Sequence, residues 1–222
     1  MTELRVRRNE GDSLDVVSVV NPFPVTVEDL AFRQTFLGAP TMADLLWRIS
    51  AAGQIFVASD ADQNDTVLGQ TSFVNTTPTF LLSVPAGAIA IPLFVNLDTT
   101  GTVAGGAIDV IIEASFLTNA YASGGTSEKI QGTRKGWHAP RCALWSGPTA
   151  TAGYGVRLYA TTMDQTIATT AAPPGFWKPE VPYILEGPAS LNIFTYAATT
   201  GPTWFWSVGW AEIFDPAVGD LS

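Results

Sequence analysis

The stretch Val84–Leu117, VPAGAIAIPLFVNLDTTGTVAGGAIDVIIEASFL, decides the fold class of this chain. In its second half, Ala107–Phe116, apolar and more polar residues alternate, which predicts a β-strand with one buried face. Its first half, Ile89–Leu97, is apolar on nearly both sides and predicts a strand covered on both faces. The segment Asp98–Gly106 between them is rich in Gly and Thr, so we expect the two strands to form a β-hairpin.

The alternation assigns side chains to faces on each arm of this predicted hairpin. On the second arm the buried face is expected to carry Ile108, Val110, Ile112, Ala114 and Phe116. On the first arm one side holds Ile89, Ile91, Leu93, Val95 and Leu97, and the other holds Ala90, Pro92, Phe94 and Asn96. Because Pro92 has no backbone N–H to donate, we predict a sheet edge or a β-bulge at this residue.

Outside this stretch the chain predicts many more short strands, separated by Pro and Gly. They are Leu4–Arg8, Ser13–Val20, Val25–Phe36, Gln54–Ser59, Val67–Val74, Thr79–Val84, Cys142–Trp145, Gly155–Thr162, Tyr183–Glu186, Ser190–Ala198 and Trp204–Ile213. One short helix is expected over Thr41–Ser50, although Leu45–Ile49 also suits an extended chain. We therefore predict an all-β protein, an antiparallel β-sandwich of the jelly-roll type, with long loops.

Two long segments lack a strand pattern. Residues 118–136 are rich in Gly, Ser and charge, which predicts an exposed loop or an internal boundary within a single domain of residues 1–222. Thr169–Pro182 holds four prolines and predicts a stiff crossing loop.

The charge balance restricts the function. The chain has 20 acidic and 11 basic residues, a net charge of -9, which disfavours a general nucleic-acid binder because phosphate contacts need clustered Lys and Arg. We expect no sequence-specific nucleic-acid partner. Only 14% of the residues are charged, against roughly 25% in ordinary soluble domains. Between Arg48 and Lys129 the chain has no Lys or Arg, and a surface so poor in charge is typical of one that neighbouring subunits cover.

Cysteine content and hydropathy suggest the compartment. The single cysteine, Cys142, permits no internal disulfide and is expected to be a small buried hydrophobe in a protein that matures in a cytoplasm. The charged first residues are followed by no long apolar run, and no run approaches the roughly 20 residues of a membrane span. A secretory signal and a transmembrane segment are therefore not expected.

An acidic loop follows the strand predicted at Gln54–Ser59. Asp60, Asp62 and Asn64 have the opening spacing of a calcium-binding loop, but Asp65 stands where Gly is required and Thr71 where a bidentate Glu is required. A solvated turn is the default interpretation, with calcium as the alternative.

Aromatic and basic residues are the candidates for binding or for subunit contacts. In the last predicted strand the bulky side chains Trp204, Trp206 and Trp210 share one side, which indicates either an aromatic core layer or a stacking platform for sugars or a partner. Phe176 and Trp177 in the Pro-rich segment are further stacking candidates. Basic residues gather at Arg134, Lys135 and Arg141 and offer a possible partner surface.

Little in the sequence indicates catalysis. The only histidine, His138, has no recognisable nucleophile motif beside it, and no phosphate-binding glycine motif occurs. Carboxylate pairs for glycoside hydrolysis can be nominated, Asp109 with Glu113 or Glu180 with Glu186, but nothing selects them over solvated residues. We expect no enzyme, no cofactor and no metal.

Two segments carry a resemblance to a known class of proteins. VPAGAIAIPLFVNLD with AIDVIIEAS, and the closing LNIFTYAATTGPTWFWSVGWAEI, resemble β-rich virion proteins of bacteriophages, above all single-jelly-roll capsid subunits. This resemblance implies a non-enzymatic structural protein that self-assembles into, or decorates, an icosahedral shell, with itself and other virion proteins as partners. It also implies assembly in the host cytoplasm and a final location in the virion. The alternative is a carbohydrate- or receptor-binding β-sandwich, such as a phage spike or a lectin-like module.

Overall fold

A computed structural model describes residues 4–5, 16–17, 42–60, 66–99, 106–135, 138–151, 155–165, 175–197 and 202–213. The chain divides into two compact units, Met1–Leu46 and Trp47–Ser222. The first contains an antiparallel pair of short strands, β1 (Leu4–Arg5) and β2 (Val16–Val17). The strand expected over Val25–Phe36 lies outside the described residues. The division falls within the helix α2 (Met42–Ala51), between Leu46 and Trp47.

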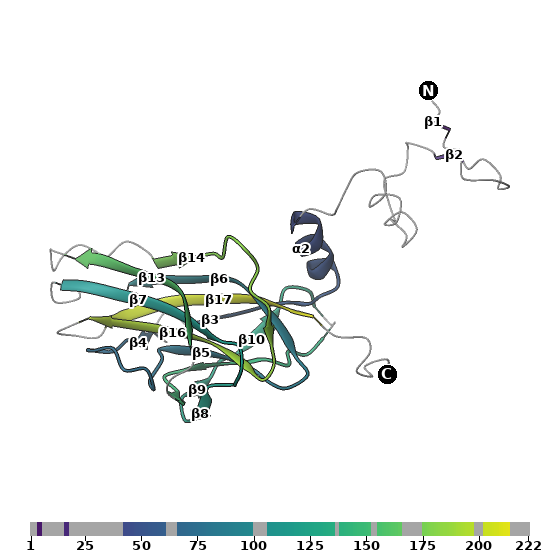
Figure 1. The fold of residues 1–222 in the computed structure, drawn as a ribbon. Helices are drawn as coiled ribbons and strands as arrows, with labels where there is room; N and C mark the ends of the chain where they lie inside the picture. The colour runs from purple at the N-terminus through teal and green to yellow at the C-terminus, as the bar shows by residue number, and fades with distance from the viewer. Residues whose placement is uncertain are drawn as a thin grey trace. The chain divides into compact units, whose positions relative to one another are not determined.

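The second unit contains two large antiparallel sheets (Figure 1). The first sheet has the order β10-β3-β17-β6-β14, with β4 beside β17 and β15 beside β6. Its strands are β3 (Ile55–Ser59), β4 (Val67–Leu68), β6 (Ile89–Thr99), β10 (Ile130–Gly132), β14 (Gly175–Trp177), β15 (Leu185–Glu186) and β17 (Thr203–Ile213).

The second sheet has the order β13-β7-β16-β5-β11-β9. Its strands are β5 (Phe80–Val84), β7 (Gly106–Ser115), β9 (Thr126–Ser127), β11 (Ala143–Ser146), β13 (Val156–Gln165) and β16 (Ala189–Ala197). A separate small pair is formed by β8 (Tyr121–Ser123) and β12 (Thr149–Ala150). Residues 118–136, expected as a loop, therefore contribute three short strands, β8, β9 and β10.

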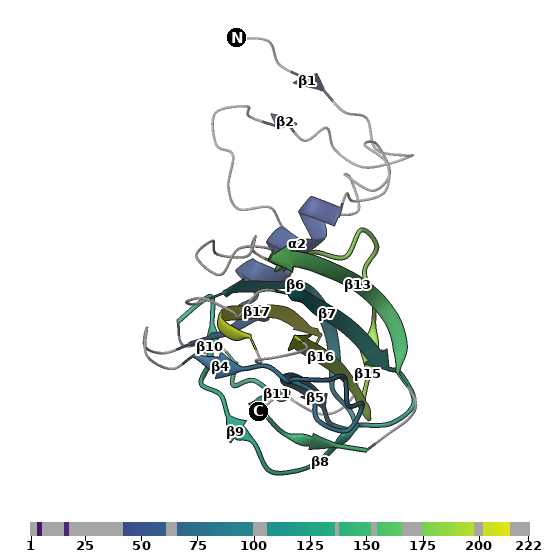
Figure 2. The ribbon, with the colours of Figure 1, turned by 90° about the vertical axis from the view of Figure 1, so that its left-hand side faces the viewer.

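The core lies between the two sheets, and Figure 2 views them from the end of their long strands. Phe56, Val95 and Trp206 of the first sheet and Phe80 and Ile112 of the second belong to one buried cluster. The rings of Phe80 and Trp206 meet across the interface, with centroids 4.7 Å apart. The predicted antiparallel β-sandwich is confirmed.

Strand pairing in the sandwich is nested along the chain. The first long strand, β3, pairs with the last, β17, and the next inward, β5, pairs with β16. Then β6 pairs with β14, and innermost β7 pairs with β13. Early and late parts of the chain therefore depend on each other throughout the sandwich.

The predicted hairpin of Val84–Leu117 is wrong, although both of its strands exist. β6 pairs with β17, β14 and β15 in the first sheet, whereas β7 pairs with β16 and β13 in the second. The two arms face each other across the core instead of sharing a hydrogen-bonded ladder. Two apolar strands joined by a short connection can either pair with each other or pack face to face in opposite sheets. Here β17 pairs with β6 and β16 pairs with β7, so the two strands do not pair with each other.

A bulge in β6 changes which residues face the core. Trp210 of β17 pairs with Pro92 and Gly209 pairs with Phe94, so Leu93 is the extra residue. Ala90 lies in the core before the bulge, and Val95 lies there after it. Of the two alternatives predicted at Pro92, the bulge is present and the sheet edge is not, because β6 has neighbours on both sides. The prediction that the odd-numbered residues from Ile89 to Leu97 share one side is wrong, because the bulge reverses the alternation.

The second arm follows the predicted alternation more closely. Ile108, Val110, Ile112 and Ala114 are all buried in the core between the sheets. Phe116 comes after the strand ends and is 37% exposed, so its assignment to the buried face is wrong. On the opposite face, Ile111 and Ser115 are buried as well, because other segments cover this side of the second sheet.

The expected helix is present as α2 (Met42–Ala51). Ile49 in its last turn is buried against Ile91 of β6 and Ala211 of β17, on the outer side of the first sheet. The helix ends where Gly53 adopts a positive φ of 68° and its N–H donates to the carbonyl of Ser50 at 2.9 Å.

Candidate functional site

The tryptophans of β17 lie in the interior. Trp204 and Trp210 are fully buried, and Trp206 is 3% exposed. All three belong to the core between the sheets. A sugar ring has no access to these indoles, so the core interpretation holds and the stacking platform at Trp204, Trp206 and Trp210 is wrong.

On the opposite side of β17, Gly209 leaves room for the side chain of a neighbouring strand. A Cβ placed on Gly209 would meet the ring of Phe94 in β6. The nearest atoms to this face at Gly209 therefore belong to an aromatic side chain.

The three indole N–H groups differ in their partners. Trp204 Nε1 donates to Thr195 Oγ1 at 2.8 Å, and that hydroxyl is also 2.9 Å from Thr79 Oγ1. Trp210 Nε1 donates to Glu212 Oε1 at 2.9 Å. Among the described residues, Trp206 Nε1 has no hydrogen-bond partner although it is buried.

Phe176 and Trp177 point to opposite sides of β14. Trp177 is 6% exposed, belongs to the core and stacks on Tyr183, with ring centroids 6.4 Å apart. Phe176 is 57% exposed. Of the five aromatic candidates, Phe176 alone offers an open ring to a partner.

Glu212 is a buried carboxylate that the sequence pattern does not single out. It is 1% exposed and lies on β17. Its Oε2 accepts from the backbone N–H of Arg141 at 2.8 Å, and its Oε1 accepts from the N–H of Cys142 at 3.1 Å as well as from Trp210. Glu212 therefore ties the segment that enters β11, in the second sheet, to the last strand of the first sheet.

Cys142 is buried beside this carboxylate. It is 3% exposed, in agreement with the prediction of a small buried hydrophobe. Burial raises the pKa of its thiol, and the negative charge and hydrogen bonding of Glu212 raise it further. The thiol is therefore held in its protonated, unreactive form.

The basic residues contact different parts of the second unit. Arg134 donates to the carbonyl of Ala51 at the end of α2, and Arg141 Nη1 donates to the carbonyl of Gly87 at 3.4 Å. Lys135 and His138 are exposed. Arg134 and Arg141 therefore each contact a backbone carbonyl of the second unit. Binding of a partner at Arg134, Lys135 and Arg141 stays a prediction.

The possible calcium ligands are only partly described. Asp60 follows β3, whereas Asp62 and Asn64 lie outside the described residues. In the ranges that the structure covers, no three His, Cys, Asp or Glu side chains come together as metal ligands.

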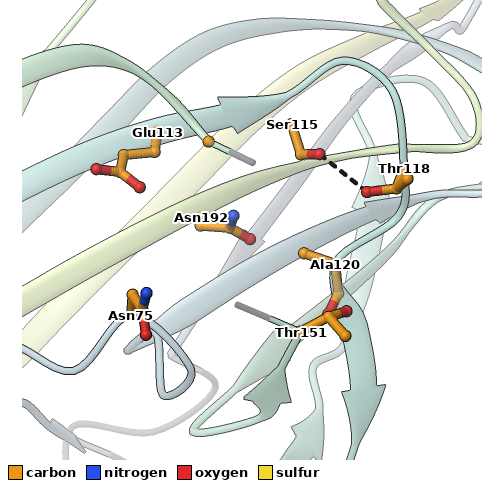
Figure 3. A pocket seen from close by; sticks show the side chains of 8 residues that line it. Asn75, Glu113, Ser115, Thr118, Ala120, Thr151 and Asn192 are labelled. Atoms are coloured by element: carbon orange, nitrogen blue, oxygen red, sulfur yellow. Dashed lines mark hydrogen bonds between the residues drawn. The ribbon is translucent and has the colours of Figure 1, made fainter. Parts of the chain in front are cut away.

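A polar pocket opens on the outer face of the second sheet, the face turned away from the core (Figure 3). Its volume is about 420 Å³. Its polar lining consists of Asn75, Glu113, Ser115, Thr118, Thr151 and Asn192. Ala120 and Gly155 complete it, and a Cβ on Gly155 would lie 2.7 Å from Glu113 Oε2.

Asn192 and Glu113 form the floor of this pocket. They are directly opposite each other on β16 and β7. Asn192 is 6% exposed, and its Oδ1 has no hydrogen-bond partner within the described part of the chain. Glu113 Oε1 lies 3.6 Å from Arg157 Nη2 of β13. Figure 3 shows the Asn192 amide in the middle of the ring of labelled residues.

The nominated carboxylates do not share the pocket. Glu113 lines the pocket, whereas Asp109 accepts a hydrogen bond from Thr162 Oγ1 at 2.5 Å outside it. Glu180 and Glu186 are exposed. Asn192 was missed because it has no motif, and the one available signal was an amide within the apolar strand SLNIFTYA.

Neither a search for membrane-spanning helices nor a comparison with known proteins assigns a role to these sites. No helix in the described ranges is both long and apolar enough to cross a bilayer. Comparisons of this chain with protein-family models, curated proteins and solved structures found no match.

Proposed function

We propose that this chain is a non-enzymatic structural protein that self-assembles into, or decorates, an icosahedral virion shell made of jelly-roll subunits. The observation that carries the proposal is the nested pairing of β3 with β17, β5 with β16, β6 with β14 and β7 with β13. A long antiparallel hairpin rolled into two sheets has this pairing, which supports a jelly roll, an architecture of viral capsid and lectin domains.

The free edge at β14 supports self-assembly. In the described part of the chain, β14 pairs only with β6. Phe176, Val181 and Ile184, in and just after β14, are 57%, 58% and 57% exposed. An edge strand with exposed apolar residues nearby favours association with another chain. We propose these three residues as a subunit contact.

The chemistry of the candidate nucleophile and base supports a role without catalysis. The only thiol, Cys142, is buried and its pKa is raised, so it is a poor nucleophile. The only histidine, His138, is exposed. A thiol needs a lowered pKa or an adjacent base to act as a nucleophile.

The shell proposal is tested by the size of the purified full-length protein. Size-exclusion chromatography with light scattering should find pentamers, hexamers or particles, and electron microscopy should show closed assemblies. Phe176→Ser should raise the concentration needed for assembly at least tenfold, because it removes an exposed ring from the proposed contact.

Leu68→Ser is the matched control. Leu68 is 65% exposed on β4 of the same sheet and pairs beside β17, not at the β14 edge. Its variant should assemble like the wild type. A protein that stays monomeric at high concentration contradicts the shell proposal, and equal effects of the two variants contradict the β14 contact.

A further inference from the structure

We propose that the polar pocket on the outer face of the second sheet binds a neutral, polyhydroxylated ligand of the sugar or polyol class. This inference is independent of the shell proposal, because an assembled subunit and a monomer can both present this pocket. It rests on an unpaired buried acceptor, on the charge balance of the pocket and on the side chains around it.

The unpaired acceptor is Asn192 Oδ1. A buried polar atom without a hydrogen bond costs about 1–3 kcal/mol, so such atoms are uncommon in folded proteins. Asn192 is 6% exposed and lines the pocket, where a donor from a bound molecule can reach it. The ligand must therefore present an O–H or N–H group to this position.

The charge balance favours a neutral ligand over a cation. Glu113 is the only carboxylate in the pocket lining, and the Arg157 guanidinium lies 3.6 Å from it. This neighbour offsets the negative charge, so an ammonium group gains little from the site. A calcium ion prefers several carboxylate oxygens, which this lining does not provide.

The remaining lining suits hydroxyl groups, which both donate and accept. Ser115 Oγ and Thr118 Oγ1 lie 3.3 Å apart beside the Asn192 amide (Figure 3). Thr151 Oγ1 donates to the carbonyl of Ala120 at 3.0 Å, which leaves its lone pairs for a ligand donor.

The size of the pocket is consistent with a small ligand. Its volume of about 420 Å³ falls in the range of small-molecule sites, roughly 300–1,000 Å³. Gly155 keeps this space open beside Glu113, since a Cβ there would lie 2.7 Å from the carboxylate. A monosaccharide or disaccharide is therefore the class we assign.

The test is saturation-transfer NMR on the full-length protein with glucose, galactose, mannose, N-acetylglucosamine, trehalose and glycerol. At least one of these probes should bind. Asn192→Leu keeps the approximate volume but removes the acceptor, so it should weaken binding at least tenfold. It should leave the melting temperature unchanged or higher, because an unpaired buried acceptor is removed.

A second pair of variants tests charge and does not depend on the folding of Asn192→Leu. Glu113→Gln should keep binding within about threefold, whereas Glu113→Ala should weaken it at least tenfold. Asp109→Asn, on the same face of β7 but outside the pocket, is the matched control and should bind like the wild type.

Three results overturn the inference. One is that no probe in the panel binds to the folded wild type, which makes the pocket a site for water only. Another is binding that survives Asn192→Leu and Glu113→Ala unchanged. The third is loss of binding in Glu113→Gln, which means that the negative charge of Glu113 carries the binding and that the offset by Arg157 is wrong. The shell proposal is measured separately by assembly size, so failure of one does not imply failure of the other.

Discussion

Glu212 and Asn192 are both buried polar side chains on strands of the sandwich, and they differ in their hydrogen-bond partners. Glu212 is 1% exposed and accepts hydrogen bonds from two backbone N–H groups and an indole N–H. Asn192 is 6% exposed and keeps an oxygen without a partner among the described residues. The first therefore stabilises the fold, and the second leaves room for a ligand.

The position of each residue explains this difference. Glu212 lies where β17 of the first sheet meets the segment that enters β11, so donors from that segment converge on it. Asn192 lies on the outer face of the second sheet, under segments that enclose a pocket of about 420 Å³. The two side chains are similarly buried, and they differ in the number of donors within the protein that reach them.

The largest expected effect is at Glu212. Glu212→Ala leaves the N–H groups of Arg141 and Cys142 and the Trp210 indole without their acceptor. We expect the free energy of unfolding to fall by about 3 kcal/mol or more, since each unpaired buried donor costs about 1–3 kcal/mol. Urea denaturation followed by tryptophan fluorescence measures this loss.

Glu212→Gln is the control for this comparison. The amide retains one acceptor oxygen and nearly the same shape, so its loss should be clearly smaller than that of the alanine variant. If Glu212→Ala unfolds at the same urea concentration as the wild type, Glu212 has no structural role.

A pH dependence of stability is expected from Cys142. In the unfolded chain its thiol ionises near its usual pKa of about 8.5, whereas in the folded protein burial and Glu212 raise that pKa. Above about pH 8.5 the unfolded chain releases a proton that the folded protein keeps, so stability falls as pH rises. The slope contributed by one proton is about 1.4 kcal/mol per pH unit.

Cys142→Ala isolates this contribution. Its urea midpoint should fall less steeply between pH 8.5 and 10 than that of the wild type. In the folded wild type the thiol should also resist alkylation by iodoacetamide and react only on unfolding. Parallel pH profiles for the two proteins contradict the assignment.

A smaller effect is expected from two neighbouring tryptophans. Trp204→Phe removes a hydrogen bond to Thr195, whereas Trp206→Phe removes an indole N–H that has no partner in the described residues. Both substitutions remove similar volume from the same core, so their difference reports the hydrogen bond. Trp204→Phe should be more destabilising by about 1 kcal/mol in thermal unfolding. An equal or reversed order means that the bond adds no net stability.

Local patterns predict much of the fold. Alternation places the three tryptophans of β17 on one side of that strand, and they are buried. It likewise places four residues on one side of β7, and these are also buried: Ile108, Val110, Ile112 and Ala114. The helix at Met42–Ala51 and the bulge beside Pro92 also follow from local chemistry. These features depend on φ/ψ preferences and on the two-residue period of a strand, which neighbouring residues set.

The candidate site is much less predictable. Asn192 meets Glu113 only because β16 lies beside β7, and nothing near either residue specifies that pairing. Glu212 meets Cys142 across 70 residues of chain. Which hydrogen-bond donors and acceptors meet in a buried site depends on contacts between residues far apart in the sequence. Composition and local spacing therefore do not reveal the site.

Local sequence is sufficient to specify short strands with one apolar face in this chain, because side-chain alternation and Gly and Pro punctuation are local properties. Which strands pair depends on contacts between distant parts of the chain. In the folded protein β6 and β7 lie in opposite sheets, and the bulge changes which side chains of β6 face the core. Other segments form a pocket over the outer face of β7 and β16 at Glu113 and Asn192. Apolar faces are interchangeable in water, and only the best joint packing and hydrogen bonding of all strands selects among them.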